Sequence, residues 1–371
     1  MSRNWMYEID TPALVIDVPQ MKENIREYHE AVEKAGCHVR AHVKTHKIPA
    51  IAKMQIEMGS RGIAVAKISE AEIMADAGID DILIAYPIIG EMKLERLAKL
   101  NQRLKKLTVS VESLEGGRQL SEAGVKYGKK FRVIVDVDTG EMRRTGFLYE
   151  EAYDAALELA KLPGIEVVGV YAYAYMTYKG KRLGSAQEAG HKEGEAVVAL
   201  ANRLREAGLN LEIVAGGSTP TGRYVAEVDG ITEVHPGEYP FLDAKLNYYG
   251  YSYDSCAAKI LVTVVSSSSE RIVFDGGSKT LATDLARGVP PLNLDGYGWV
   301  VGHPELKIDH MSEEHGVIMS RNGEPIDIPI GTKLLLIPNH ICPSVILHNY
   351  AYFVDGDTIE KVKIEGRGAL T

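Results

Sequence analysis

The sequence has few cysteines and no long apolar run. It has three cysteines, Cys37, Cys256 and Cys342, which is a small and odd number for a disulfide framework. Any functional cysteine would therefore act as a thiol. No apolar stretch approaches the roughly 18 residues that a membrane-spanning helix needs, and the first ten residues contain no hydrophobic signal region. We therefore expect no membrane segment and a cytoplasmic protein.

Positive charge is also in deficit. The 371 residues carry 42 Lys and Arg against 51 Asp and Glu, which gives a formal net charge of −9, and the basic residues are scattered. Nucleic acid binding needs a basic field, so nucleic acid is excluded as a partner. A composition of 45% hydrophobic and 25% charged residues is that of an ordinary globular protein, long enough for two domains.

Short apolar runs alternate with helical segments over the first two thirds of the chain. Strands this apolar, separated by helices, indicate a parallel sheet that is covered by helices, either a closed barrel or an open doubly wound sheet. Eight strands in a row match a (β/α)8 TIM barrel, and an α/β protein of this kind is our prediction. The run at residues 13–17 is one strand too many and is expected to pair elsewhere. The eight expected strands are the one ending at Lys44 and residues 62–66, 81–85, 107–111, 131–138, 167–174, 211–215 and 231–235.

The pattern changes near Tyr248. From Ala258 onward helical periodicity disappears, and short β-branched runs recur between turn signals such as Asn322-Gly323 and Asp355-Gly356. This indicates a second, C-terminal all-β domain. We predict that residues 18–250 form the barrel, and that residues 1–17 and 251–371 form the β-domain.

The segment His38–Lys47 places a lysine where the first barrel strand is expected to end. Because side chains alternate between the two faces of a strand, Arg40, His42 and Lys44 would share one face. An unpaired buried charge costs several kcal/mol, so an anionic group is expected nearby. A lysine in such a site has a lowered pKa and can attack a carbonyl to form a Schiff base. The alternative is an edge strand with a solvated basic face.

Phosphate in (β/α)8 barrels is often held by the loops after the seventh and eighth strands. The seventh expected strand runs into Gly216, Gly217, Ser218 and Thr219, where glycines let the backbone approach a phosphate and hydroxyls donate to it. The eighth ends in 235–239, HPGEY, which offers further backbone donors. A simple tight turn is the alternative for the seventh loop. Together with a Schiff-base lysine, such a cradle implies pyridoxal phosphate (PLP).

His340 and Cys342 form the candidate metal site. At a spacing of two residues their side chains can point to one side, and an imidazole with a thiolate suits zinc. Two ligands do not close a structural site, so the remaining positions would hold water or substrate. The alternative is a buried cysteine packed as a small hydrophobic residue beside a histidine in a turn.

Taken together, these segments resemble the D-serine dehydratase / D-threonine aldolase family, whose members are alanine-racemase-like (fold type III) enzymes that use PLP and a divalent metal. The resemblance covers nearly the whole chain, and its motifs occur in the expected order. They are residues 40–47 (RAHVKTHK), 216–221 (GGSTPT), 233–243 (EVHPGEYPFLD), 275–279 (DGGSK), 313–316 (EEHG) and 338–343 (PNHICP).

The resemblance implies a role for individual residues. Lys44 would form the internal aldimine, and Arg144 would bond the phenolic oxygen of the cofactor. His340 and Cys342 would bind the metal, Zn2+ in the first place, with Mn2+ or Mg2+ as alternatives. Relatives are usually homodimers that act on small D-amino acids. The residues expected around PLP are His42, Lys44, Arg144, Tyr173, Gly216, Gly217, Ser218, Thr219 and Tyr239.

The resemblance also frames the reaction. Many relatives carry Gly-His after the sixth strand where this chain has Tyr175 and Met176, which leaves the substrate open. Aldolases of the family tend to pair the metal histidine with Asp and dehydratases with Cys, so Cys342 favours dehydration. We therefore predict elimination from β-hydroxy-D-amino acids, D-serine giving pyruvate and ammonia. The alternatives are retro-aldol cleavage to glycine and an aldehyde, a metal-independent racemase, and a non-catalytic PLP carrier; carriers lack a β-domain, and residues 258–371 argue against that reading.

Overall fold

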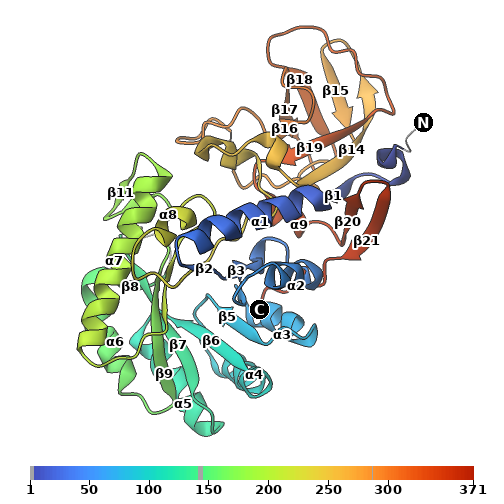
Figure 1. Ribbon diagram of the computed structural model, residues 1–371. Coiled ribbons are helices and arrows are strands. Elements are labelled where there is room, and N and C mark those ends of the chain that lie inside the picture. Colours follow the sequence, from blue (N-terminus) through green and yellow to red (C-terminus); the bar gives the residue numbers. More distant parts are fainter. Residues whose placement is uncertain (1–3, 141–144, 286) are drawn as a thin grey trace. The chain divides into compact units, whose positions relative to one another are not determined.

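The computed structural model describes residues 4–140, 145–285 and 287–371, which divide into two compact units (Figure 1). The barrel unit comprises Arg26–Gly237 and Ala369–Thr371, and the β unit comprises Met1–Ile25 and Glu238–Gly368. Among the described residues, no helix combines the length and the apolarity needed to cross a membrane.

The barrel unit is built on one parallel sheet with the order β2-β13-β12-β9-β7-β6-β5-β4-β3. β2 pairs with β13 and β3 pairs with β4, so the strand broken at Arg40 joins the two ends of the sheet. With β2 and β3 as one position, the eight expected strands and the barrel prediction are confirmed. The strands are β2 (His38–Val39), β3 (Ala41–His42), β4 (Ile63–Val65), β5 (Asp81–Ile84), β6 (Lys106–Val111), β7 (Phe131–Asp138), β9 (Ile165–Ala172), β12 (Ile213–Gly216) and β13 (Glu233–Val234), with β8 (Phe147–Leu148) beside β7.

Helices connect these strands. Serine caps set two of the starts: Ser113 Oγ accepts from the Gly116 amide, and Ser185 Oγ accepts from the Glu188 amide. Small and aliphatic side chains from β4, β5, β7, β9 and β12 form a buried cluster. The helices are α1 (Val18–Lys34), α2 (Pro49–Glu57), α3 (Ile68–Asp76), α4 (Glu91–Arg103), α5 (Leu114–Lys126), α6 (Tyr149–Ala160), α7 (Ala186–Glu206) and α8 (Gly222–Ala226), and a short hairpin joins β10 (Thr177–Tyr178) to β11 (Lys181–Arg182).

The β unit contains a mostly antiparallel sheet with the order β17-β18-β15-β14-β1-β20-β21, to which β19 and β16 are added. β1 pairs antiparallel with β14 and parallel with β20, which confirms that residues 13–17 pair outside the barrel. The strands are β1 (Ala13–Asp17), β14 (Ala258–Ser267), β15 (Arg271–Phe274), β16 (Gly298–Val300), β17 (Leu306–Met311), β18 (Gly316–Ser320), β19 (Lys333–Pro338), β20 (Tyr350–Asp355) and β21 (Thr358–Lys363).

The segment of the β unit that carries His340 and Cys342 includes a short helix. The apolar residues after Pro338 form the short helix α9 (Ile341–Val345). Ile341 and Val345, four residues apart, are both fully buried, so the apolar pattern has a helical period over this single turn. Pro343 fits because the first turn of a helix needs no amide donor. Cys342 is therefore positioned by a helix, and His340 by the residue before it.

Candidate active site

Lys44 lies beyond the end of its strand. β3 ends at His42, and Val43–Thr45 form one 3-10 turn that is closed by hydrogen bonds from the His46 and Lys47 amides to the Val43 carbonyl. The prediction that Lys44 continues the face of a strand is therefore wrong. The side chain is partly exposed, and its Nζ lies over the Tyr173 ring, 5.8 Å from the ring centroid.

The anionic partners of Arg40 come from the barrel itself. Arg40 Nε donates to Glu233 Oε1 at 2.7 Å, and its Nη1 donates to Asp81 Oδ1 at 2.7 Å. Burial alone would lower the pKa of the guanidinium, but the two carboxylates outweigh burial and raise it. The guanidinium therefore links β13 to β5 as a structural charge, and it is not left to bind a ligand.

Lys47 is committed to a buried ion pair. Its Nζ lies 2.7 Å from Glu70 Oε1 and donates to the Ala369 carbonyl at 2.9 Å. The side chain is buried, in contrast to the partly exposed Lys44 three residues earlier. Of these two lysines, Lys44 is the more exposed, and Lys47 is the one whose amine pairs with the buried Glu70 carboxylate.

His46 is held neutral directly after the Lys44 turn. Its Nδ1 accepts from the Ile48 amide at 3.0 Å, so the ring proton sits on Nε2 and is donated to Gln55 Oε1 at 3.1 Å. Burial lowers the pKa of His46 to about 4, and the two hydrogen bonds only partly offset this effect. A neutral ring with both nitrogens engaged anchors the segment that carries Lys44.

The loop after β12 is braced from α7. Gly217 has φ +86°, and a Cβ at this position would lie 2.6 Å from the Gly222 Cα, so only glycine fits. The buried Glu193 carboxylate accepts from the Gly217 amide at 2.6 Å and from the Ala174 amide at 3.2 Å. One acidic side chain thereby fixes two segments that follow neighbouring strands.

Some polar groups of the same loop form hydrogen bonds within the protein. The Ser218 amide donates to Thr221 Oγ1 at 2.9 Å, and the Tyr28 hydroxyl is shared by the carbonyls of Ser218 and Thr219 at 3.1 and 3.2 Å. The helix that follows, α8, has only five residues. The Ser218 hydroxyl also shares a hydrogen bond with Thr221 Oγ1 at 2.8 Å, so a phosphate in this loop would meet hydroxyl groups over a glycine turn that excludes a Cβ.

Aromatic rings continue from the end of β9. Tyr171 stacks on His235 with ring centroids 4.9 Å apart, and Tyr173 stacks on Tyr175 at 6.2 Å. Burial lowers the pKa of His235, although its hydrogen bond with Glu233 opposes the shift, so the imidazole is neutral and donates from Nε2. Tyr175 has φ +53°, a backbone conformation that favours glycine, at the position where the resemblance leads one to expect a glycine.

The other three residues that were predicted to surround PLP, His42, Arg144 and Tyr239, do not all belong to one unit of the described structure. His42 is buried at the end of β3, in the barrel unit. Arg144 lies outside the described residues. Tyr239 is fully buried and belongs to the β unit.

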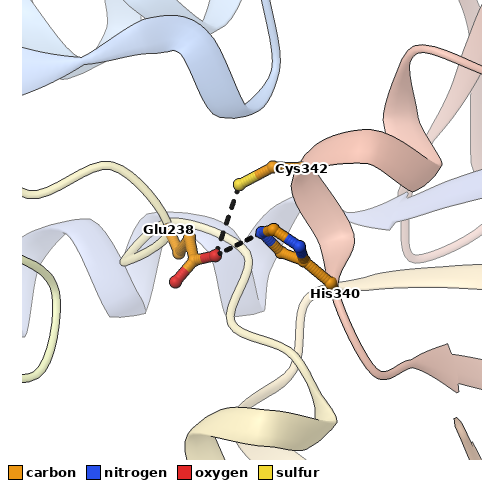
Figure 2. A group of neighbouring side chains, drawn as sticks. All are labelled: Glu238, His340 and Cys342. Carbon is orange, nitrogen blue, oxygen red and sulfur yellow. Dashed lines mark hydrogen bonds and ion pairs between the residues drawn. The ribbon is translucent and has the colours of Figure 1, made fainter. Parts of the chain in front are cut away.

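Figure 2 shows the candidate metal centre in the β unit, where His340, Cys342 and Glu238 converge. His340 Nε2 lies 3.1 Å from Glu238 Oε1, and the Cys342 thiol donates to the same oxygen at 3.3 Å. The three potential ligand atoms all lie within 4.8 Å of one another. An imidazole, a thiol and a carboxylate at this spacing fit a divalent ion of the zinc type.

Asp284 fixes the orientation of the His340 ring. The carboxylate accepts from Nδ1 at 2.5 Å, which leaves Nε2 directed at Glu238. Burial alone would lower the pKa of His340, but its hydrogen bonds to Asp284, Cys342 and Glu238 outweigh burial and raise it to about 12. A carboxylate behind a histidine is the usual support of a metal-bound imidazole.

Lys245 and Asp243 complete the cluster. Lys245 Nζ forms ion pairs with Glu238 and, at 2.7 Å, with Asp243 Oδ2. Burial would raise the pKa of Glu238, but Lys245 and His340 outweigh it and hold the carboxyl ionised. Burial raises the pKa of the Cys342 thiol, and the neighbouring Glu238 adds to the increase. A metal would have to displace the thiol proton, as thiolate ligation always requires.

Sequence reasoning missed Glu238 and Asp284, the two carboxylates in contact with His340, as it missed Asp243 and Lys245 behind them. Glu238 lies in the segment HPGEY, which was expected to offer backbone donors to a phosphate. Its signal was a lone acid after the last barrel strand. Asp284 lies five residues after the motif 275–279 but outside it, and its sequence surroundings do not mark it as a partner of His340.

The chain matches two family models. The model "Alanine racemase, N-terminal domain" matches residues 16–244, and the model "Putative serine dehydratase domain" matches residues 257–354. Together they account for both parts of the chain.

Known relatives match over nearly the whole length. D-threonine aldolase of Arthrobacter sp. is 30% identical, covering 97% of this chain and 93% of its own, and D-threo-3-hydroxyaspartate dehydratase of Delftia sp. is 31% identical, covering 91% and 92%. Two solved mutants of D-threo-3-hydroxyaspartate dehydratase have the same fold. The cysteine-to-alanine mutant, in a metal-free form, has a TM-score of 0.89 at 27% identity, covering 96% of this chain and 98% of its own. The histidine-to-alanine mutant has a TM-score of 0.87 at 27% identity, covering 96% and 95%.

Proposed function

This chain belongs to the alanine-racemase-like family of D-serine dehydratases and D-threonine aldolases, and we propose that it is a PLP- and metal-dependent lyase that eliminates water from β-hydroxy-D-amino acids. The products would be a 2-oxo acid and ammonia. The observation that carries the proposal is that one chain contains both a partly exposed Lys44 and the His340–Cys342 centre.

We assign the covalent attachment of PLP to Lys44. Support comes from its partial exposure and from the ion pair that commits Lys47 elsewhere. The phosphate would be held by the hydroxyls of Ser218 and Thr219 over the turn at Gly217, with Gly216 preceding it. His42 and Tyr173 would flank the ring, and Arg144 and Tyr239 stay proposed cofactor contacts. When bound, PLP supplies an electron sink for charge that develops at Cα.

Lys44 would also act as the base. With substrate bound, the Lys44 Nζ amine would remove the Cα proton. Nζ lies over the Tyr173 ring, which would form one side of its surroundings. The β-hydroxyl would leave with a proton as water, and a divalent ion would supply Lewis-acid assistance at this oxygen.

His340 and Cys342 would hold that ion, with Zn2+ preferred because of the thiolate. The two solved dehydratase mutants replace a histidine and a cysteine that lie two residues apart, the spacing of His340 and Cys342, and the cysteine mutant is described as metal-free. This likeness supports a metal site at the corresponding residues here.

Retro-aldol cleavage is the second candidate, because D-threonine aldolase is among the similar proteins. Product analysis separates the two reactions. The holoenzyme should convert D-serine or D-threo-3-hydroxyaspartate to a 2-oxo acid and ammonia, whereas glycine and an aldehyde from every substrate would establish the aldolase. Racemisation of D-alanine in the presence of chelator would establish neither lyase and would favour a racemase.

Removal of the metal tests the centre itself. A chelator should abolish turnover while the absorbance of bound PLP and the circular dichroism spectrum persist, because an open site serves chemistry more than folding. Added Zn2+, Mn2+ or Mg2+ should restore activity to different extents.

We further propose that the protein is a homodimer in the cytoplasm. Light scattering of the purified enzyme tests the oligomeric state, and cell fractionation tests the location.

A further inference from the structure

We propose that Glu238 is a third protein ligand of the metal ion, so that imidazole, thiolate and carboxylate hold it and one position stays open for substrate. The inference rests on the proposed function for the presence of the ion. It adds that this chain encloses the ion more completely than a histidine and cysteine alone would do.

The distances are close to those of a formed site. Ligand atoms around a tetrahedral ion with bonds of about 2.0–2.3 Å lie about 3.3–3.8 Å from one another. Glu238 Oε1 lies 3.1 Å from His340 Nε2 and 3.3 Å from Cys342 Sγ. Shifts of a few tenths of an ångström, within the reach of side-chain rotation, would open room for the ion.

Each proposed ligand residue is fixed by a hydrogen bond or by secondary structure. Asp284 fixes the His340 ring through Nδ1, and the first turn of α9 carries Cys342. The backbone of Glu238 is held by the Phe241 and Leu242 amides, which donate to its carbonyl at 3.0 and 2.8 Å. Supported ligands of this kind are typical of metal centres, because the support fixes their orientation before the ion arrives.

Lys245 does not obstruct this role. Its ammonium pairs with Glu238 but also lies 2.7 Å from Asp243 Oδ2, so it keeps a carboxylate partner if Glu238 turns to an ion. Three protein ligands with one open position is the usual form of a catalytic zinc site. Glu238 and a Cys342 thiolate together also match the charge of a divalent ion.

The test is metal binding by the PLP-loaded protein after metal removal. Zn2+ titration of Glu238→Gln should give a Kd raised by at least about 10–100-fold, the loss that even outer-shell partners produce. Glu360→Gln, an exposed carboxylate on β21, is the matched control and should bind like the unaltered chain. With Co2+, the thiolate-to-cobalt band should persist in Glu238→Gln, while the visible bands that report coordination should change.

The outcomes separate the two proposals. If His340→Ala and Cys342→Ala lose the ion while Glu238→Gln keeps the original Kd and cobalt spectrum, Glu238 is not a ligand and the proposed function stands. If the unaltered chain shows no cobalt–thiolate band, both proposals fall. Should Glu238→Gln not fold, a zinc-bound crystal structure of the unaltered chain decides: a Zn–Oε1 distance near 2.0–2.2 Å supports the ligand, and one beyond about 3 Å overturns it.

Discussion

Two buried ionic clusters, one in each unit, use their charges in different ways. In the barrel unit, the Arg40 guanidinium donates to both Glu233 and Asp81, and Glu233 also accepts from His235. In the β unit, His340, Cys342 and Lys245 all converge on the single Oε1 of Glu238. The first cluster is closed in that its central cation already has two carboxylate partners, whereas the second is centred on one carboxylate oxygen that three groups approach.

The difference lies in what each cluster can exchange. Arg40 cannot lose its proton, so its ion pairs are permanent crosslinks between strands. An imidazolium or a thiol can lose a proton and bind a metal ion instead. The Lys245 ammonium also pairs with a second carboxylate, that of Asp243. A buried charge therefore indicates function when its partners are exchangeable, and structure when they are not.

The largest effect should come from a cation that belongs to neither cluster. Lys44→Ala is expected to lose turnover entirely, because the side chain is assigned both the covalent link and the Cα base. Borohydride reduction and peptide mapping of the unaltered enzyme should place the cofactor on Lys44. Lys53→Ala, an exposed lysine on α2, is the control and should keep activity. A label on Lys47 would contradict the assignment.

Breaking the closed cluster should cost stability rather than chemistry. Arg40→Met removes the partner of two carboxylates, one of them fully buried, and is expected to lower the free energy of unfolding by about 3–5 kcal/mol. Arg26→Met, which breaks an exposed pair with Glu30 on α1, should cost about 0.3–0.5 kcal/mol. Urea denaturation compares the two. Equal costs would show that the Arg40 pairs are not the crosslink described above.

His46 should make the barrel unit sensitive to acid. Its folded pKa of about 4 lies below the ordinary value of 6.5, so the unfolded chain binds the proton first as pH falls. Stability from this group is complete above pH 6.5 and decreases as pH falls towards 4, by about 3 kcal/mol in total. His46→Gln should flatten the unfolding free energy over this interval. An unchanged slope in the variant would assign the acid sensitivity to other groups.

Glu193 should give the smallest effect, because it is a buried acid whose carboxylate accepts from two backbone amides. Glu193→Gln replaces a carboxylate acceptor at the Gly217 amide and is expected to raise the Kd for PLP about 10-fold, equal to about 1.4 kcal/mol. Absorbance titration of the PLP-free protein measures it. Glu195→Gln, an exposed residue on the same helix, should leave the Kd unchanged. Equal values for both variants would remove Glu193 from the support of the loop.

Periodicity predicted the barrel because its strands are buried on both faces and its helices carry capping residues. The helix α9 escaped prediction because one turn of apolar residues is too short to distinguish a helix from a strand. Lys44 was placed on a strand face because alternation says nothing about where pairing stops. That end is set by the 3-10 turn that the His46 and Lys47 amides close on the Val43 carbonyl.

The site was predictable only where its residues stand close together in the sequence. The spacing of two residues between His340 and Cys342 indicates a shared site, whereas Glu238 and Asp284 belong to loops that are distant in the sequence. The basic residue Arg40 looked functional because its acids, Glu233 and Asp81, are remote in sequence. Charge balance is a tertiary property, and a single strand does not reveal it.

The pairing of β1 has a consequence for the order in which the chain is synthesised. Leu14 and Ile16 are fully buried in the folded protein, yet their strand pairs with residues 258–261 and 351–354. A ribosome therefore releases this apolar segment hundreds of residues before its partners exist, and closing so long a loop is slow. Throughout that interval the strand is a natural recognition site for a chaperone that binds extended apolar segments.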